Sequence, residues 1–172
     1  MRTAALLASD DALIAQCEVD RYRASGPGGQ HRNKTESAIR LRHRLTHTTA
    51  IGEDSRSQSE NKLHAVRRLR AAIALSVREP VPLEGFAPSP RLAALVANGT
   101  APLGKQTRLT GEYWAAIAEL LDLLVAGELE IGTTAHRLGI TTGALSKLLL
   151  HDDQVARAVN DLRRAKAMRP LR

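Results

Sequence analysis

The stretch that decides the fold runs Arg23-Ala24-Ser25-Gly26-Pro27-Gly28-Gly29-Gln30-His31-Arg32-Asn33-Lys34. It holds three glycines in four positions around one proline, a composition that a packed helix or strand would not accept. We therefore expect a loop whose backbone can approach a ligand closely, because glycine adopts φ values that other residues avoid. Gln30 is the uncharged amide at its tip, and cationic residues flank it on both sides. The pattern predicts a loop that brings bare backbone close to an anionic partner.

Positive charge is concentrated around this loop. The chain of 172 residues carries 25 Lys and Arg against 18 Asp and Glu, a net charge of +7. Between residues 21 and 44 one acid, Glu36, stands against seven basic residues, so this segment alone carries +6. The seven are Arg21, Arg23, Arg32, Lys34, Arg40, Arg42 and Arg44. Such a concentration beside a glycine loop favours contact with nucleic-acid phosphates over an ordinary solvated face or a membrane.

The composition excludes several other classes of protein. The length allows one medium domain or two small ones, and 43% hydrophobic residues are enough for a core. A single cysteine, Cys17, excludes a disulfide framework and a cysteine-rich zinc site, and we expect it to be a buried apolar side chain. No apolar run approaches the roughly 20 residues of a membrane span, and the first residues make a poor signal peptide. The histidines show no metal-ligand spacing. We therefore expect a cytoplasmic protein with no metal, no cofactor and no membrane partner.

The first half of the chain is expected to form a small sheet. A strand precedes the loop, with Cys17, Val19 and Tyr22 facing one way. Residues 37–45 alternate apolar residues with arginines, which is typical of a strand with one buried face and one face presented to an anion. Residues 46–51 are rich in threonine and are expected to pair with it as a third strand.

Helices are expected to fill the rest of the chain. The first begins at a capping box, residues 57–60, and ends near residue 78 before a proline-rich linker. Further helices are expected at residues 91–97, 111–126, 133–138, 142–150 and 152–168, with a helix-turn-helix around Gly139. We predict an α+β protein with a small mixed β-sheet and a covering helix, followed by a helix-turn-helix-like module. The predicted divisions are residues 1–79, the linker 80–90 and the helical module 91–172.

A longer pattern surrounds the glycine loop, and it is far more specific than Gly-Gly-Gln alone. It comprises Ser25-Gly26, Gly28-Gly29-Gln30, Asn33-Lys34, Ser37-Ala38-Ile39-Arg40-Leu41 with His43, Arg56-Ser57-Gln58 and Asn61-Lys62. With this pattern, residues 14–78 resemble the peptidyl-tRNA hydrolase domain, or GGQ domain, of class I peptide chain release factors. Residues 1–79 are accordingly expected to form a release-factor-type GGQ domain.

The resemblance implies a catalytic role for Gly28, Gly29 and Gln30. In the family this loop enters the peptidyl transferase centre of the large ribosomal subunit, where it promotes attack of water on the ester between nascent peptide and tRNA. The backbone N–H of Gln30 is suited to bind the developing oxyanion because it needs no reorganisation. The two glycines permit the backbone conformation that aims it. The tip carries no ionisable side chain, which favours positioning over a general base supplied by the protein.

The resemblance also assigns the flanking residues to RNA contact or to bracing of the loop. RNA-binding roles are expected for Arg23, Arg32, Lys34, Arg40, Arg42, Arg44, Arg56 and Lys62. Bracing roles are expected for Ser25, Gly26, Asn33 and Ser37. For His31 and His43, packing or RNA contact is favoured over catalysis. The family glutamine is often methylated, so a glutamine methyltransferase acting on Gln30 is a candidate partner beside large-subunit rRNA and peptidyl-tRNA.

One departure from the family concerns how the loop is brought to the peptidyl transferase centre. Full release factors have additional domains that read stop codons, and 172 residues leave no room for them. The chain therefore resembles the short, codon-independent relatives that hydrolyse peptidyl-tRNA on stalled ribosomes or split large subunits. A non-catalytic ribosome- or RNA-binding factor is an alternative. A helix-turn-helix DNA regulator is a weaker one, since residues 142–150 offer one basic side chain, Lys147, to bases. The helical half is expected to dock on the ribosome or tRNA, or else to form a structural cap.

Overall fold

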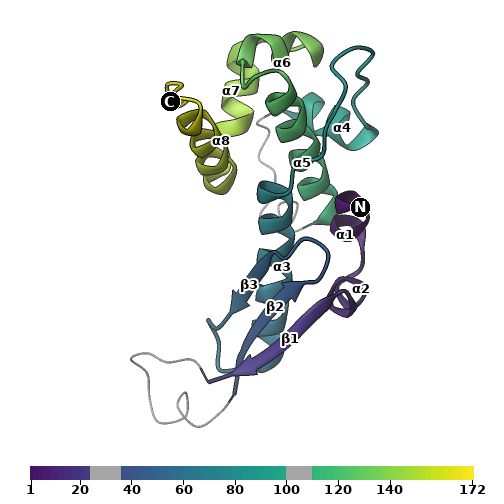
Figure 1. The fold of residues 1–172 in the computed structure, drawn as a ribbon, viewed down its shortest axis with the longest axis vertical. Helices are drawn as coiled ribbons and strands as arrows, with labels where there is room; N and C mark the ends of the chain where they lie inside the picture. Colours follow the sequence, from purple (N-terminus) through teal and green to yellow (C-terminus); the bar gives the residue numbers. More distant parts are fainter. Residues whose placement is uncertain (24–35, 100–109) are drawn as a thin grey trace. The chain divides into compact units, whose positions relative to one another are not determined.

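The computed structural model describes residues 1–23, 36–99 and 110–172, and residues 24–35 and 100–109 lie outside this description. The chain forms two compact units, residues 1–73 and 74–172 (Figure 1), and each is described by itself. The expected α+β class is confirmed, since a three-stranded sheet accompanies eight helices in the described residues. The predicted domain boundaries at residues 79 and 90 stay predictions.

Unit 1 is built on an antiparallel sheet with the strand order β1-β2-β3. Its elements are α1 (Arg2–Leu7), α2 (Asp10–Ala15), β1 (Cys17–Tyr22), β2 (Ala38–His43), β3 (Thr49–Gly52) and most of α3 (Gln58–Ser76). Both strand pairs are antiparallel, whereas the sequence led us to expect a mixed sheet. Antiparallel neighbours need only a short connection, such as the one from β2 to β3.

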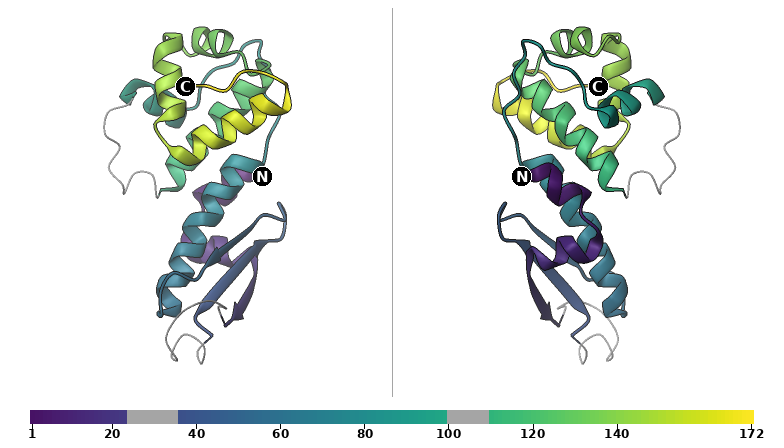
Figure 2. Two further views of the ribbon diagram at one scale, coloured as in Figure 1. Left: turned by 90° about the vertical axis from the view of Figure 1, so that its left-hand side faces the viewer. Right: turned by 90° about the vertical axis from the view of Figure 1, so that its right-hand side faces the viewer.

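The alternation predicted along β2 is confirmed. Ile39, Leu41 and His43 are buried, whereas the two arginines between them are exposed, as a period of two requires. Helix α3 lies along one face of the sheet (Figure 2) and adds the fully buried Leu69 and Ile73 to the core. The sheet is thus packed on one side and leaves its arginines on the other.

The expectation that Cys17, Val19 and Tyr22 face one way is wrong for Tyr22. Strand alternation puts Tyr22 on the face of Asp20 and Arg40, and the Arg40 guanidinium lies 5.9 Å from the centroid of its ring.

Val19 lies on the same face as Cys17, opposite Leu41, but it is not buried. Cys17 is buried and its thiol donates to the carbonyl of Leu13 at 3.2 Å, but Val19 is 43% exposed. Strand β1 lies at the edge of the sheet, and an edge strand has a neighbour on one side only. Apolar residues at its middle positions therefore stay accessible.

The capping box at the start of α3 is formed in part. The Glu60 amide donates to Ser57 Oγ at 3.4 Å, as the box requires. The reciprocal bond runs through a third residue: the Ser57 amide donates to Ser55 Oγ at 3.1 Å, and the Ser55 hydroxyl donates to the Glu60 carboxylate. The backbone amides of Ser57 and Glu60 are therefore both hydrogen-bonded, and the Ser55 hydroxyl links the Ser57 amide to the Glu60 carboxylate.

A buried arginine of α3 holds the first two helices, which the sequence did not predict. The Arg70 side chain is 7% exposed. Its guanidinium donates to the carbonyls of Leu6 (3.3 Å) and Ala8 (2.5 Å) and to the Asp10 carboxylate (2.5 Å). A buried charge is tolerated when it is paired and hydrogen-bonded in this way. Arg70 thus ties the α1–α2 connection to α3.

Unit 2 is helical. Its helices are α4 (Pro90–Asn98), α5 (Gly111–Ala126), α6 (Ile131–Arg137), α7 (Thr142–Leu150) and α8 (Asp153–Ala165). Helix α5 supplies most of the core, including the fully buried Ile117, Leu120 and Leu121. The turn between α6 and α7 contains Gly139 at φ 66°, a left-handed conformation that glycine accepts without strain.

Four of the five helices in the described part of unit 2 begin at capped N-termini, α6 being the exception. Side-chain oxygens of the N-cap residues Ser89, Thr110, Thr141 and Asp152 accept from amides of the first turn, as N-caps typically do. Within the described residues, no helix combines the length and apolar character needed to cross a membrane.

Candidate functional site

The strands that flank the glycine loop are neighbours. Strand β1 ends at Tyr22 and β2 begins at Ala38, and these two residues are paired across the sheet. The predicted residues Ser25, Gly26, Gly28, Gly29, Gln30, Arg32, Asn33 and Lys34 lie outside the described residues. What the structure describes is the base from which they depart.

A buried asparagine holds that base. Asn61, in the first turn of α3, is fully buried. Its Nδ2 donates to the carbonyls of Ser37 (2.8 Å) and Ser55 (2.7 Å), and its Oδ1 accepts from the Ser55 amide at 2.9 Å. One side chain therefore joins the segment entering β2, the β3–α3 connection and α3. We call these contacts the Asn61 clamp.

A second amide reinforces the same base from the surface. Gln58 Nε2 donates to the carbonyl of Glu36 at 2.9 Å. On the other side of the base, Arg23 Nε lies 3.7 Å from the Glu36 carboxylate, and both side chains are more than half exposed. An exposed pair of this kind contributes little, about 0–1 kcal/mol, so the buried Asn61 clamp dominates.

Strand β3 approaches α3 without a side chain between them. A Cβ added at Gly52 would lie 1.9 Å from the carbonyl oxygen of Asn61 and 3.0 Å from the amide nitrogen of Ala65. Both atoms belong to helix backbone, so only glycine fits here. The absence of a side chain at Gly52 thus allows the α3 backbone at Asn61 to pack directly against β3.

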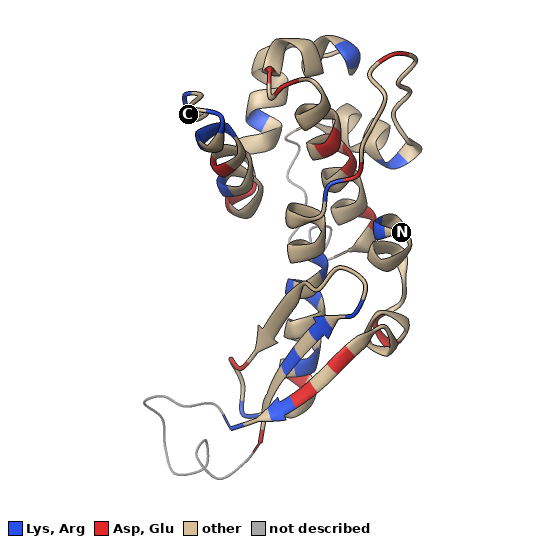
Figure 3. Cartoon of the chain, viewed as in Figure 1, with Lys and Arg blue, Asp and Glu red and all other residues tan. Residues whose placement is uncertain are grey.

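The arginines of β2 face carboxylates of β1. The strand register pairs Asp20 with Arg40 and Glu18 with Arg42. Asp20 and Arg40 form an ion pair, and Glu18 Oε2 lies 3.6 Å from Arg42 Nη1. Figure 3 shows the acidic bands of β1 beside the basic bands of β2. These four side chains and Thr49 line a hollow of about 390 Å³.

This neutralised face refines the predicted RNA-binding role of Arg40 and Arg42. The charge of +6 was given for residues 21–44, a segment that does not include Glu18 and Asp20. Exposed ion pairs are worth about 0–1 kcal/mol, so a phosphate can displace the carboxylates at little cost. The RNA-binding role of these arginines stays a prediction.

The other described arginines and lysines differ in what they contact. Arg44 donates to the carbonyls of Ala15 (3.2 Å) and Cys17 (3.0 Å), so it ties the end of α2 to β1. Arg56 and Lys62 are exposed beside the first turn of α3. They lie close in sequence to the Asn61 clamp, and their RNA-binding role stays a prediction.

His43 is part of the core. It is 1% exposed, its Nδ1 lies 2.8 Å from Thr46 Oγ1, and its Nε2 lies 3.2 Å from Gln16 Oε1. The Thr46 amide donates to Nδ1 at 3.3 Å, so Nδ1 is an acceptor and Nε2 carries the proton. The side chain is therefore satisfied as a neutral imidazole.

We expect His43 to make unit 1 less stable in mild acid. Burial lowers its pKa below the usual value of 6.5, so below that pH the unfolded state binds more protons than the native state. The stabilising contribution is therefore present above pH 6.5 and is lost as the pH falls below it. Unfolding monitored by hydrogen exchange of β2 amides at a series of pH values should show the loss. A His43→Gln variant should flatten this part of the profile, and an unchanged profile would contradict the assignment.

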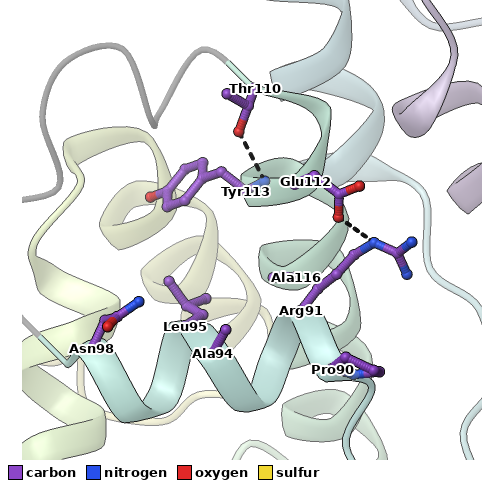
Figure 4. A pocket seen from close by; sticks show the side chains of 9 residues that line it. All are labelled: Pro90, Arg91, Ala94, Leu95, Asn98, Thr110, Glu112, Tyr113 and Ala116. Atoms are coloured by element: carbon purple, nitrogen blue, oxygen red, sulfur yellow. Dashed lines mark hydrogen bonds and ion pairs between the residues drawn. The ribbon is translucent and has the colours of Figure 1, made fainter.

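Unit 2 contains a groove between α4 and the start of α5 (Figure 4), with a volume of about 460 Å³. Arg91 pairs with Glu112 at one side of it, and Thr110 Oγ1 accepts from the Tyr113 amide at 3.3 Å. Leu95 contributes an apolar wall. The described lining of the groove includes no serine, cysteine or histidine. Among the described residues, no group of His, Cys, Asp and Glu is arranged to hold a metal ion.

Sequence reasoning missed the role of Asn61 and Gly52. Asn61 was part of the motif, but no role was assigned to it. The available signal was its spacing: Asn61, Ala65 and Leu69 recur every fourth residue and are all buried, so a polar residue lies on an apolar stripe. A buried amide side chain needs hydrogen-bond partners. Backbone groups near the loop could therefore have been predicted as the partners of Asn61.

Comparison with known proteins matches the first part of the chain. A family model described as the RF-1 domain matches residues 13–82. Peptide chain release factor 1 of Albidiferax ferrireducens is 46% identical over 77 residues, which are 41% of this chain and 21% of that protein. Peptide chain release factor 2 of Shewanella baltica is 53% identical over 68 residues, or 37% and 19%. This chain thus spans about a fifth of the length of these curated relatives.

Proposed function

We propose that the chain acts in translation termination as a peptidyl-tRNA hydrolase, because residues 13–82 match the RF-1 domain family model and are similar to peptide chain release factors 1 and 2. The substrate is the ester between a nascent peptide and its tRNA, and the partner is the peptidyl transferase centre of the large ribosomal subunit. The observation that carries the proposal is the family match across the loop and its base. The Asn61 clamp supports it, because a loop that acts by positioning needs a fixed base.

In the proposed mechanism, the loop supplies position and hydrogen bonding. The backbone N–H of Gln30 donates to the oxyanion that develops on the ester carbonyl. Gly28 and Gly29 permit the backbone conformation that aims this N–H, and the Gln30 amide side chain positions the attacking water. The proton and the leaving ribose oxygen are handled by RNA and water at the peptidyl transferase centre, since the tip carries no ionisable side chain.

We extend the proposal to codon-independent rescue of stalled ribosomes or separated large subunits in the cytoplasm. The family match ends at residue 82, and the residues beyond it belong to helical unit 2. We propose that unit 2 recruits the chain to the ribosome. A glutamine methyltransferase acting on Gln30 is a further proposed partner.

The test is peptide release from defined ribosome complexes. Labelled peptidyl-tRNA is placed in the P site of ribosomes that carry an empty A site, a sense codon or a stop codon, and on isolated large subunits. We expect release without a stop codon. Release that requires a stop codon would contradict codon independence. Binding to ribosomes without release from any complex would instead support a non-catalytic ribosome-binding factor.

A further inference from the structure

The ends of all three strands meet where the glycine loop leaves the sheet. Strand β1 ends at Tyr22, and β2 begins at Ala38 directly opposite. Because β3 is antiparallel to β2, it ends at the same end of the sheet (Figure 1), and Glu53 follows its last residue. The ends of the two outer strands and the start of the central strand therefore lie together.

A hydrogen bond spans this end of the sheet. The Tyr22 hydroxyl donates to Glu53 Oε2 at 3.0 Å, and so joins the end of β1 to the residue after β3 across the central strand. Directly opposite residues on one face of a sheet have Cβ atoms about 4.5–5.5 Å apart, so Tyr22 lies beside the fully buried Ala38. We call Tyr22, Glu53 and the bond between them the Tyr22 brace.

Arg40 contacts the ring of the same tyrosine. Its guanidinium carbon lies 5.9 Å from the ring centroid, within the distance of about 6 Å at which a cation is attracted to an aromatic face. Arg40 is itself paired with Asp20 of β1. The Tyr22 side chain is therefore held at its hydroxyl by Glu53 and at its ring by Arg40.

The Tyr22 hydroxyl is a donor at neutral pH. Partial burial raises the pKa of Tyr22 above its usual value of 10, and the hydrogen bond and charge of Glu53 raise it further, against a smaller opposing effect of Arg40. The phenol therefore keeps its proton, and the bond to the Glu53 carboxylate needs no change of protonation.

The Tyr22 brace and the Asn61 clamp hold different sides of the loop base. The Asn61 clamp reaches the carbonyl of Ser37, and Gln58 reaches that of Glu36, both on the side where the chain returns to β2. Tyr22 lies on the side where the chain leaves β1. A loop that acts by placing a backbone N–H needs both sides of its base fixed, because freedom at either side misplaces the donor.

We propose that Tyr22 is a positioning residue for peptide release, acting through its hydrogen bond to Glu53 on the departing side of the glycine loop. This role rests on the proposed function of the loop, whereas the contacts of the brace stand without it. Tyr22 takes no part in the chemistry; it limits the orientations open to the residues that follow it. Loss of the brace should therefore slow hydrolysis on bound ribosomes without changing how tightly the chain binds them.

The first test is single-turnover peptide release from stalled complexes over a range of protein concentrations. Tyr22→Phe keeps the ring and removes the hydroxyl, and Glu53→Ala removes the acceptor. Each should lower the maximal rate by about 3- to 10-fold, less than the roughly 100-fold loss from a 1 Å misplacement, because Arg40 still contacts the ring. The half-saturating protein concentration should stay unchanged. Glu53→Gln keeps an oxygen that accepts the bond and should keep most of the wild-type rate.

Asp54→Ala is the matched control. Asp54 is the next residue and is also exposed, but its carboxylate contacts His64 at 3.3 Å and Arg68 at 2.8 Å, both on α3. Asp54→Ala and Glu53→Ala remove the same charge, so a general electrostatic effect on ribosome binding would appear in both. The maximal rate of Asp54→Ala should equal that of wild type.

The double variant Tyr22→Phe/Glu53→Ala distinguishes one shared bond from two independent effects. Both substitutions remove the same bond, so the double variant should be no slower than the slower single variant. Losses that multiply in the double variant would overturn the proposal, as would full activity of Tyr22→Phe or a Glu53→Gln variant as slow as Glu53→Ala. A raised half-saturating concentration with an unchanged maximal rate would also overturn it, since that pattern indicates weaker binding.

Backbone order at the loop base is measured without ribosomes, so that the brace is tested apart from the proposed function. The NMR order parameter of the Arg23 amide should fall in Tyr22→Phe and Glu53→Ala and keep its wild-type value in Glu53→Gln and Asp54→Ala. If the wild-type chain releases no peptide but shows this pattern, the brace is supported and the proposed function fails. An unchanged Arg23 order parameter in both Tyr22→Phe and Glu53→Ala would overturn the brace whatever the release activity.

Discussion

Gly29→Ala is expected to reduce the rate of peptide release from stalled complexes by about 100- to 1,000-fold, the usual loss when one oxyanion donor is removed. The reason is that the proposed donor is the backbone N–H of the next residue, Gln30. A Cβ at position 29 restricts the φ and ψ values from which that N–H is aimed. The measurement is single-turnover release at saturating protein, which reports the hydrolysis step rather than recruitment.

The chain offers a matched control for this substitution. Gly143 lies in α7, and a Cβ added there would meet nothing within 4 Å. Gly143→Ala should therefore leave release unchanged and stabilise unit 2 by less than the roughly 0.5–1 kcal/mol gained inside a helix, since Gly143 lies in the first turn of α7. Gln30→Ala should cost less than Gly29→Ala because it keeps the backbone N–H. Full activity of Gly29→Ala, with RNA binding intact, would refute the loop mechanism.

The sequence was sufficient for most of the elements because their signals are local. Alternation in β2 follows from a period of two, and α5 covers the predicted residues 111–126. Helix α7 was likewise located by Thr141 and Gly139. Such signals depend on neighbours a few residues away, so they can be recognised without the tertiary structure.

The contacts that define the site depend on residues far apart in the sequence. Arg70 binds residues sixty or more positions away, and Arg40 meets Asp20 only because of the strand register. Arg70 shares helical spacing with the buried Val66 and Ile73, which indicates burial, but the groups that it binds cannot be identified from the local pattern. The same holds for Gly52, whose need for glycine arises from the backbone of α3.

The loop motif and its base were therefore predictable to different degrees. Gly28-Gly29-Gln30 was identified by its composition and by a resemblance, both of which are properties of the sequence. The bracing roles given to Ser25, Gly26 and Asn33 concern residues outside the described ranges and stay predictions. Ser37 is buried and its carbonyl takes part in the Asn61 clamp. The side chain that makes the clamp lies twenty-four residues further on.

Asn61→Ala is expected to lower the free energy of unfolding of unit 1 by about 3 kcal/mol. It leaves the carbonyls of Ser37 and Ser55 and the Ser55 amide without the partner they have now, and each buried group left unsatisfied costs about 1–3 kcal/mol. Hydrogen exchange of the Leu41 amide in β2 is a suitable measurement. Trp114 lies in unit 2, so its fluorescence would report the other unit.

Gln58→Ala is the matched control, because it removes an amide that also bonds a carbonyl at the loop base but is exposed. It should cost no more than about 0.5–1 kcal/mol, since water can replace the lost bond. If positioning through the base matters for catalysis, Asn61→Ala that is still folded should also slow single-turnover release, while Gln58→Ala should not. Equal effects of the two substitutions on stability would show that the clamp does not hold the base. If Asn61→Ala lowers stability but does not slow release, the clamp stabilises unit 1 without positioning the loop for catalysis.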